Sequence, residues 1–420
     1  MASNRQDKNL RVLVSGAGIC GHVLAYWLGK AGISVTVIER ADQLRREGQT
    51  VDIRNEGIQI IKWMGVEEEI KGRTTKEKGL KFVNAENKVM ASFPQTDDGM
   101  SFTSDVEIVR GELAQVFYDA SKGKSEYIFG DSIESIDDSE ASIRVTLAKD
   151  KSRVLEYDVL IIGEGLASRT RAKAFHEDVR APIRCLNQWV ASFSFEKGKT
   201  DDEWARIFHA PKRRALLVRP DGFGNVRCSA VCMDFGEETK MIGSSQTSRQ
   251  DQKEYFRNLY RGVGWEAERI MEGLDLSTDL YVQEVAQTRC STWSKGRVAL
   301  VGDTAYCPSP ITGMGTTAAI LGSYILAAEI VKHQNDHRAA FTAYEAYFRP
   351  WIEKIQKIPP GFPALANPET WWGIRILHTC ASFASLIVNS GLVSFLSRII
   401  PSFGGSQLKL PDPSLFEPRQ

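Results

Sequence analysis

The sequence has no excess charge of either sign, no paired cysteine pattern and few histidines. Its 53 Lys and Arg residues balance 53 Asp and Glu residues, so no long-range field favours nucleic acid as a partner. The seven cysteines are odd in number and scattered, which does not suit a disulfide framework. Among the six histidines, His333 and His337 share a predicted helix face but have no third ligand nearby, so we expect no metal site.

The N-terminal residues 2–9 are polar and charged and lack the apolar core of a secretory signal. We therefore expect a protein of the reducing cytoplasm, without an obligate protein partner. The chain has 420 residues, of which 42% are hydrophobic and 25% charged. These values predict a soluble protein of two domains.

The first forty residues have the pattern of a dinucleotide-binding βαβ unit. A predicted buried strand over 11–15 is followed by Gly16, Gly18 and Gly21, then by a helical segment, and a second strand ends at Glu39. The glycines permit a tight turn, the approach of a pyrophosphate and close packing of helix on strand. The pyrophosphate would sit on the helix N-terminus. A carboxylate at Glu39 can accept ribose hydroxyls, which favours FAD or NAD over NADP.

A second strand-to-helix turn near residue 300 favours FAD. Residues 297–302 predict a buried strand ending at Asp303, and a proline-broken loop then leads to Gly313 and Gly315 at the start of a small-residue helix. Asp303 can accept a hydrogen bond from a polyol hydroxyl, and the helix start offers unpaired N–H groups. NAD would not need a carboxylate at this remote strand end, whereas the ribityl chain of a flavin dinucleotide does.

Three more segments belong to the same pattern. Residues 48–55, around Asp52, predict an irregular loop and a short strand, and Arg110 stands near the start of a predicted helix. Residues 157–171 again predict strand, glycine turn and helix, around Glu164.

Together these motifs resemble those of the group A flavoprotein monooxygenases, the para-hydroxybenzoate hydroxylase-like family. Residues 48–52 and 302–315 are most similar to the tetracycline-inactivating branch, and the resemblance extends from about residue 11 to residue 344. It implies an α/β fold with a Rossmann-like FAD-binding domain, an inserted mixed β-sheet substrate domain and a C-terminal helical segment.

The resemblance also implies which residues hold a non-covalent FAD. The glycine turn and Glu39 would hold the ADP half, Arg110 the pyrophosphate or ribityl region, and Asp303 the ribityl chain. Asp52 would lie against the flavin, and residues 313–315 would cradle the isoalloxazine carbonyl edge. The full implied set is Gly16, Gly18, Gly21, Glu39, Arg40, Asp52, Arg110, Glu164, Asp303, Pro308, Gly313, Met314 and Gly315.

One stretch departs from the family pattern. Ile162 replaces a glycine and Glu164 replaces the usual aspartate, which puts the handling of pyridine nucleotide there in doubt. A turn carboxylate without any cofactor contact is the alternative for Glu164.

The implied reaction is an NAD(P)H-consuming oxygen insertion from O₂ through a flavin C4a-hydroperoxide, with NAD(P)H bound only transiently. We expect hydroxylation of an apolar, aromatic or polycyclic small molecule, in secondary metabolism or xenobiotic modification. Epoxidation, Baeyer–Villiger oxidation, dehydrogenation and a non-enzymatic escort protein on this fold are the alternatives. A halogenase is not favoured, because residues 371–375 do not match its Trp-x-Trp-x-Ile-Pro signature.

The motifs divide the chain into discontinuous domains. We expect an FAD-binding domain from 1–80, 102–180 and 285–350, a substrate domain from 81–101 and 181–284, and a helical tail from 351–420. The region 181–284 shows strand-like alternation, a turn at 221–224 and a helix from Asp251 to Trp265, and residues 81–101 predict a hairpin. Candidates to face the substrate are Arg54, Gln188, His209, Arg219 and Phe223, and a structural role is an equal alternative for each.

The tail contains an uncharged apolar stretch at residues 376–397. It is nearly long enough to span a bilayer, but His378, Asn389 and several serines make it a poor spanning segment. We expect one helix or two short ones packed across both domains. Peripheral membrane contact through 376–400 is an alternative that the sequence does not favour.

Overall fold

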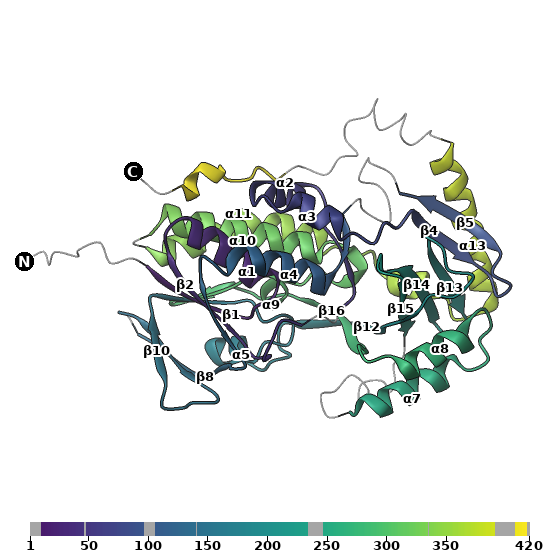
Figure 1. The fold of residues 1–420 in the computed structure, drawn as a ribbon, viewed down its shortest axis with the longest axis horizontal. Helices are drawn as coiled ribbons and strands as arrows, with labels where there is room; N and C mark the ends of the chain where they lie inside the picture. The colour runs from purple at the N-terminus through teal and green to yellow at the C-terminus, as the bar shows by residue number, and fades with distance from the viewer. Residues whose placement is uncertain are drawn as a thin grey trace, which may run out of the picture.

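The computed structural model describes residues 10–45, 48–95, 106–139, 141–233, 247–334, 336–390 and 408–417. Two large sheets stand side by side, with most helices packed on the first (Figure 1). The far end of the predicted hairpin (96–101) and the C-terminal part of the stretch 376–400 lie outside the described residues.

The first sheet is built around a fully buried parallel strand. Its order is β17-β18-β11-β1-β2-β7, from β17 (Ser294–Lys295), β18 (Val298–Leu300), β11 (Val159–Ile162), β1 (Arg11–Ser15), β2 (Ser34–Glu39) and β7 (Glu126–Phe129). All but β17 run parallel. Strands buried on both faces are apolar throughout, as the burial of Val12–Val14 and Val159–Ile162 shows. The carboxyl ends of β1, β2, β11 and β18 therefore meet at one edge, where the sequence motifs also end.

Helices cover one face of this sheet and a small sheet lies on the other (Figure 1). Helix α10 (Gly315–Lys332) packs between α1 (Ile19–Lys30) and α11 (His337–Ile355). Also on this side are α2 (Glu56–Trp63), α3 (Glu67–Gly72) and α4 (Arg110–Ser121). The small sheet is β8 (Ile133–Asp138), β9 (Ile143–Leu147) and β10 (Val154–Tyr157), and α5 (Arg169–Phe175) packs on β8.

The second sheet has seven strands in the order β16-β12-β15-β14-β13-β4-β5. These are β16 (Tyr281–Thr288), β12 (Ile183–Glu196), β15 (Asn225–Cys232), β14 (Arg214–Pro220), β13 (Ala205–Ala210), β4 (Gly79–Val83) and β5 (Val89–Pro94). The segments β4 and β5 form a hairpin, and β4 joins the sheet in parallel with β13. The predicted turn at 221–224 joins β14 to β15. Strand β16 crosses the boundary that the sequence placed between residues 284 and 285.

Two helices cover one face of the second sheet. Helix α7 (Arg249–Tyr260) and helix α8 (Ala267–Leu276) share a buried core with side chains such as Phe193, Phe208 and Leu216. The predicted helix from Asp251 to Trp265 was wrong at its end. It stops at Tyr260, because Gly262 and Gly264 adopt positive φ, a conformation that ends a helix at little cost for glycine. Helix α8 was not predicted.

The opposite face of the second sheet meets the loop that contains Gln49 at its β16 end and lies beneath α13 (Trp371–Asn389) at its β13 and β5 end. Side chains alternate along a strand, so Ile207, His209, Leu217 and Arg219 point away from the core that α7 and α8 cover. The Gln283 side chain on β16 donates a hydrogen bond to Gln49, 2.7 Å away. We call this surface the open face of the second sheet.

Smaller elements connect the two sheets. The antiparallel pair β3 (Thr50–Asp52) and β6 (Glu107–Val109) lies between them, and α9 (Asp303–Tyr306) with a 3₁₀ turn (Pro310–Thr312) follows β18.

The last helices lie at the far edge of the second sheet (Figure 1). They are α12 (Phe362–Ala366) and α13 (Trp371–Asn389), and α13 packs on β5 and β13. A 3₁₀ turn (Pro413–Phe416) near the end of the chain returns to α1 and α10. The expected helix across both domains is therefore corrected: α13 lies along the second sheet, because its serines bond the backbone of β5. Within the described ranges, α13 is the one helix long and apolar enough to cross a membrane, by length and composition only.

Candidate functional site: a dinucleotide cradle facing the second sheet

The turn between β1 and α1 has room only for glycine at two of its three glycine positions. Gly16 has φ +108°, and a Cβ there would lie 2.7 Å from the Gly163 carbonyl oxygen. A Cβ at Gly21 would collide with the Gly16 carbonyl oxygen. Gly18 differs, because the nearest atom to its Cβ position is Nη2 of Arg110, 3.8 Å away. The first and third glycines thus serve packing, and the second leaves an open approach to the N-terminus of α1.

Two charged side chains border this approach. Arg110 begins α4 and is exposed, and its stem passes Gly48. Asp303 begins α9 and is solvent-accessible although protein surrounds it, as at the floor of a cleft. Burial raises the pKa of Asp303, and the positive charge of Arg110 opposes that rise. A cation and an anion thus share one cleft at the carboxyl edge of the first sheet.

Glu39 lies at the end of β2, as expected, and its carboxylate already holds the local backbone. Its oxygens accept hydrogen bonds from the backbone N–H of Ala17 at 3.0 Å and of Ala41 at 2.8 Å. This fixes the carboxylate beside the glycine turn, and each oxygen keeps a further lone pair. Arg40 is exposed.

The turn from β11 to α5 is locked by its own polar contacts. Glu164 accepts hydrogen bonds from the hydroxyls of Ser15 at 2.5 Å, Ser168 at 2.7 Å and Thr170 at 2.5 Å. These bonds give Glu164 a structural role in the turn. A direct cofactor contact by Glu164 stays a prediction.

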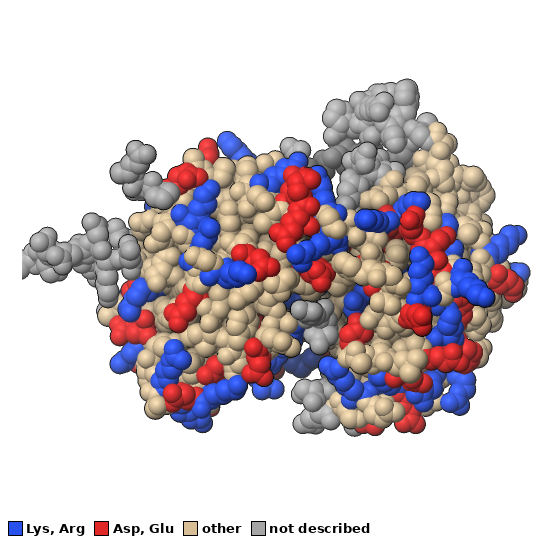
Figure 2. All heavy atoms as spheres, in the orientation of Figure 1, with Lys and Arg blue, Asp and Glu red and all other residues tan. Residues whose placement is uncertain are grey.

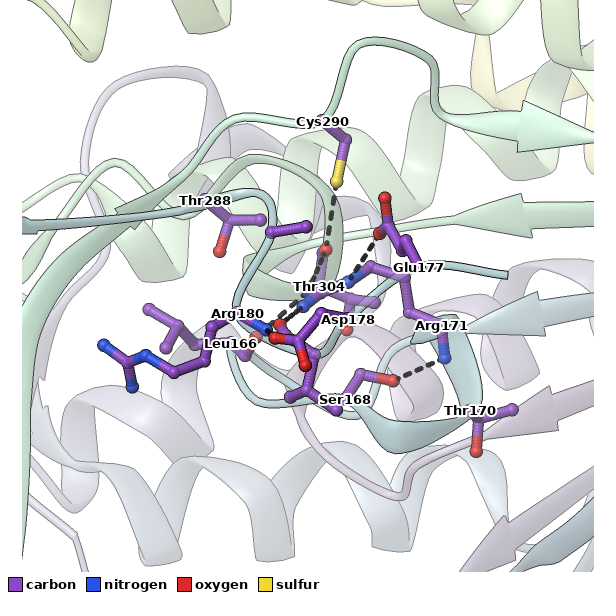
Figure 3. A network of polar contacts seen from close by, with 12 residues as sticks. Leu166, Ser168, Thr170, Arg171, Glu177, Asp178, Arg180, Thr288, Cys290 and Thr304 are labelled. Carbon is purple, nitrogen blue, oxygen red and sulfur yellow. Dashed lines mark hydrogen bonds and ion pairs between the residues drawn. The ribbon is translucent and has the colours of Figure 1, made fainter. Parts of the chain in front are cut away.

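A buried arginine joins this turn to the helix that carries Asp303 (Figure 3). Arg171 is fully buried and donates to the carbonyl oxygens of Leu166 at 3.0 Å, Val179 at 2.6 Å and Thr304 at 2.8 Å. The Gly165 N–H donates to the Thr304 hydroxyl, 2.8 Å away. Arg171 is the last residue of the predicted strand, turn and helix at 157–171, and the sequence predicts no role for it. Its contacts hold the strand ends of β11 and β18 in fixed register.

Asp52, Arg54 and the glycine loop before α10 meet on the side of the cleft nearest the second sheet. Asp52 pairs with Arg54 at 2.9 Å. The Cβ position of Gly313, where φ is +63°, lies 3.7 Å from the Asp52 carboxylate. Met314 caps α10, which begins at Gly315. The structure thus brings together residues that are about 260 positions apart in the sequence.

Pro308 is buried in the loop leading to that turn, and its carbonyl oxygen accepts from Gln287, 3.1 Å away.

A buried charge cluster joins β6 to the open face of the second sheet. Arg219 on β14 forms ion pairs with Glu107 on β6 and with Glu77 at 3.4 Å. Burial raises the pKa of Glu107 to about 8 and that of Glu77 to about 7, against the attraction of Arg219. Burial disfavours the Arg219 cation, but the two carboxyls outweigh it and raise its pKa. Asp52 adds negative charge to the same cluster and so also favours the protonated forms of the two glutamates.

The other substrate-side candidates are spread along the sheet. Gln188 is buried at a bulge in β12. Phe223 is 58% exposed in the β14–β15 turn. His209 is on the open face, but its ring lies against Phe82 and His378 beneath α13. Its partner in register on β14 is Ala215, four residues before Arg219. Burial and His378 lower the pKa of His209 to about 3, which makes it a weak base at neutral pH.

Sequence reasoning missed Glu77 and Glu107. Glu77 lies in a loop and Glu107 in a three-residue strand, so no periodicity marks them. Apolar neighbours of Glu107 (Val106, Ile108 and Val109) were the one available signal, because a lone acid in a buried strand needs a partner.

The donor set suits FAD. A helix N-terminus left open at Gly18, with the Arg110 guanidinium beside it, fits a pyrophosphate. Glu39 lies at the end of β2, where a ribose would follow, and Asp303 lies after β18 within reach of the charge of Arg110, where a polyol chain would follow. Among the described residues, no group of three or more His, Cys, Asp and Glu side chains could hold a metal ion.

Comparison with known proteins agrees with this geometry. The chain matches the family described as FAD binding domain over residues 9–356. It is 34% identical over 419 residues to monooxygenase CTB7 of Cercospora beticola, covering 97% of this chain and 98% of that one. It is 32% identical over 406 residues to the FAD-dependent monooxygenase asL4 of Sarocladium schorii, covering 90% and 93%. The solved structure of tetracycline destructase Tet(51) superposes with a TM-score of 0.76, at 26% identity, covering 96% and 100%.

The chain therefore belongs to the FAD-dependent monooxygenases of the FAD binding domain family. The predicted family, its α/β fold and its enzymatic class are confirmed.

Proposed function

We propose that this flavin monooxygenase consumes NAD(P)H and inserts one atom of O₂ into an apolar aromatic or polycyclic small molecule, with a hydroxylated product. The observation that carries the proposal is the buried contact between the two halves of the site. Arg219, on the open face of the second sheet, pairs with Glu107 beside Asp52. A substrate held against this face would lie next to the residues assigned to the flavin.

The open face has the character of a site for an apolar ligand with a polar anchor. Ile207 and Leu217 are paired in register on β13 and β14 and are half-buried. Beside them stands the ionisable cluster of Arg219 and the two glutamates. Ligand sites commonly combine apolar walls with a few convergent polar groups. A protonated carboxyl can donate to a substrate carbonyl or hydroxyl, and an ionised carboxyl can accept from a substrate hydroxyl.

Bound FAD would supply the electron transfer and the oxygen chemistry. Gly16, Gly18 and Gly21 would admit its pyrophosphate, Arg110 would neutralise it, and Asp303 would hold the polyol chain. Asp52 and the 313–315 turn would border the ring. The chain's own task is to position the two molecules and to exclude water between the sheets.

Similarity to relatives supports the substrate class. The name of Tet(51) assigns it a polycyclic substrate, tetracycline, and we extend only the polycyclic or aromatic character to this chain. We also propose a reducing compartment such as the cytoplasm, because all seven cysteines are free.

The test uses the purified yellow holoprotein under ¹⁸O₂. NADPH and NADH oxidation is followed against a panel of phenols and polyketides, and products are analysed by mass spectrometry. One ¹⁸O atom in a hydroxylated product, with stimulated oxidation of one of the two nucleotides, is the expected result. Stimulated oxidation with no label in any product across the panel would contradict the proposal.

A further inference from the structure

Helix α13 has most of its large apolar side chains on its exposed face. Its inner face consists of Ile374, His378, Ala381 and Ser385. Its outer face carries the large apolar residues, namely Trp371, Trp372, Ile376, Phe383, Leu386 and Ile387, which are 50–72% exposed. A surface helix normally buries its apolar stripe and exposes its polar one.

The inner face of α13 combines apolar and polar contacts: Ala381 packs with Ala91 and Phe93, and serines beside it bond the sheet edge. Helix α13 lies along β5, the edge strand of the second sheet, whose backbone groups would otherwise lack partners. The Ser382 hydroxyl donates to the Met90 carbonyl at 2.6 Å, and the Ser385 hydroxyl donates to the Ser92 carbonyl at 2.7 Å. The Ser385 hydroxyl also accepts from the Ser92 N–H at 3.2 Å. These bonds fix the rotation of the helix and so keep the apolar side outward.

The exposed apolar surface continues beyond α13. Of the 15 exposed large hydrophobic side chains found in the described part of the chain, ten lie on α12, on α13 and its first turn, or on the adjoining start of β5. The members outside α13 are Phe362, Leu365, Val89 and Met90. Over α13, at the upper right of Figure 2, the visible surface carries almost no charged atoms. A patch of this concentration marks an interaction site.

The charged side chains on and beside α13 are mostly basic. Residues 371–389 carry one charged side chain, Arg375, and the acid just before the helix, Glu369, is paired with Arg213 at 3.2 Å. The turn of Lys212, which is exposed, and Arg213, which is half-buried, adjoins the start of α13, because the Lys212 N–H donates to the Glu369 carbonyl oxygen at 2.7 Å. Arg375 lies over the ring of Trp372, 5.7 Å from its centroid. Tryptophan and arginine at the border of an apolar face are typical of segments that lie at the surface of a lipid bilayer.

We propose that the outer face of α13, with α12 and the 212–213 turn, docks the enzyme on the surface of an anionic lipid bilayer. The helix does not span the membrane, because its inner face is bonded to β5. Trp371, Phe383 and Leu386 enter the interface, while Lys212 and Arg375 meet anionic headgroups. This placement goes beyond the proposed reaction and does not depend on it.

The test is sedimentation of the full-length holoprotein with vesicles. Vesicles of phosphatidylcholine are compared with vesicles containing phosphatidylserine, for the wild type, the F383E/L386E double variant and the L276E variant. Leu276 is 84% exposed on α8, outside the patch, and is the matched control. We expect binding to phosphatidylserine vesicles, a loss of about tenfold or more in F383E/L386E, and no change in L276E.

A second measurement locates the contact. Brominated lipids should quench tryptophan fluorescence in the wild type, and W371F/W372F should lose most of that quenching while its flavin content stays the same. No vesicle binding by the wild type, equal binding to neutral vesicles, or equal loss in L276E would overturn the proposal. A lipid-independent dimer that F383E/L386E converts to monomers, in sedimentation velocity, would assign the patch to a second copy of the chain instead.

Discussion

The guanidinium of Arg110 stands over Gly18: a Cβ at position 18 would lie 3.8 Å from its Nη2 atom, with no closer neighbour. The space between the two is where the N-terminus of α1 is open to an anion. Gly21, one turn later, faces the Gly16 carbonyl oxygen and has no such space. Gly18 and Gly21 of the same motif therefore have different roles. Substitution of Gly18 should affect FAD binding, and substitution of Gly21 should affect folding.

We expect Gly18→Ala to fold and to lose FAD. Its φ of −90° is open to any residue, but the added methyl group occupies the approach of the pyrophosphate, so the dissociation constant for FAD should rise about 10-fold to 100-fold. Gly21→Ala should instead lower the melting temperature of the apoprotein. Flavin fluorescence on titration of apoprotein, with thermal unfolding, measures both. Gly123→Ala, in open space, is the control, and equal effects of the first two variants on folding would refute the distinction.

Asp303→Asn should weaken FAD binding with little effect on folding. The amide keeps the shape of the carboxyl but loses the charge that accepts strongly from a polyol hydroxyl, a loss of about 1.5–3 kcal/mol in binding. The same titration of apoprotein measures it. Unchanged flavin affinity in Asp303→Asn would show that the cleft acid does not hold the cofactor.

Glu164→Ala should show the reverse pattern. Its carboxylate accepts from Ser15, Ser168 and Thr170 within the protein, so its removal should destabilise the fold by about 1–3 kcal/mol. Chemical denaturation of the apoprotein reports this loss. If instead FAD affinity falls in Glu164→Ala as far as in Asp303→Asn, with stability unchanged, the carboxylate contacts the cofactor as the sequence suggested.

The contrast between Asp303 and Glu164 also shows which features of the site could be predicted from the sequence. Strand-to-helix glycine turns are local, so the order of residues between Arg11 and Glu39 and around Asp303 predicts the glycine turn and the strand ends that the structure has. The partners of Glu164 within the protein could not be predicted, because Ser15 lies 149 positions away in the sequence. A glutamate at this position of the turn is also compatible with a contact to protein or to ligand, and the sequence does not distinguish the two.

Two other features depend on long-range packing. Arg219, Glu77 and Glu107 come from three separate elements, and no spacing in the sequence links them. The stretch after Trp371 is apolar on most sides, so the sequence does not indicate which face of the helix is buried. The contacts of its serines with the edge strand β5 determine that face.

Glu107→Gln should become more stable relative to the wild type as the pH rises from 5 to 8. Burial raises the pKa of Glu107 to about 8 in the folded protein, from about 4.5 when exposed. Below pH 4.5 the carboxyl is protonated in both states and has no effect. Between the two values only the unfolded chain releases the proton, so the wild type loses stability with rising pH. The side-chain amide of the Glu107→Gln variant cannot ionise, so the variant does not lose stability in this way.

Thermal unfolding of wild type and Glu107→Gln at half-unit pH steps measures the difference. Glu112→Gln is the control, since Glu112 is on the surface helix α4 and pairs with Arg73. A constant gap in melting temperature across the range would mean that Glu107 is ionised throughout, with Arg219 dominating over burial.

His209→Gln should leave the pH dependence of turnover unchanged. The ring is buried against Phe82 and hydrogen-bonded at 3.4 Å to His378, and its pKa of about 3 leaves it neutral across the working range. Glutamine keeps a polar partner for His378, so we expect a small fall in melting temperature and an unaltered profile of kcat/KM against pH. Glu77→Gln, in the Arg219 cluster, should by contrast displace the profile near neutral pH, because it removes a group whose pKa is about 7. A profile displaced by His209→Gln and not by Glu77→Gln would make the histidine the catalytic base and move the substrate to the α13 end of the open face.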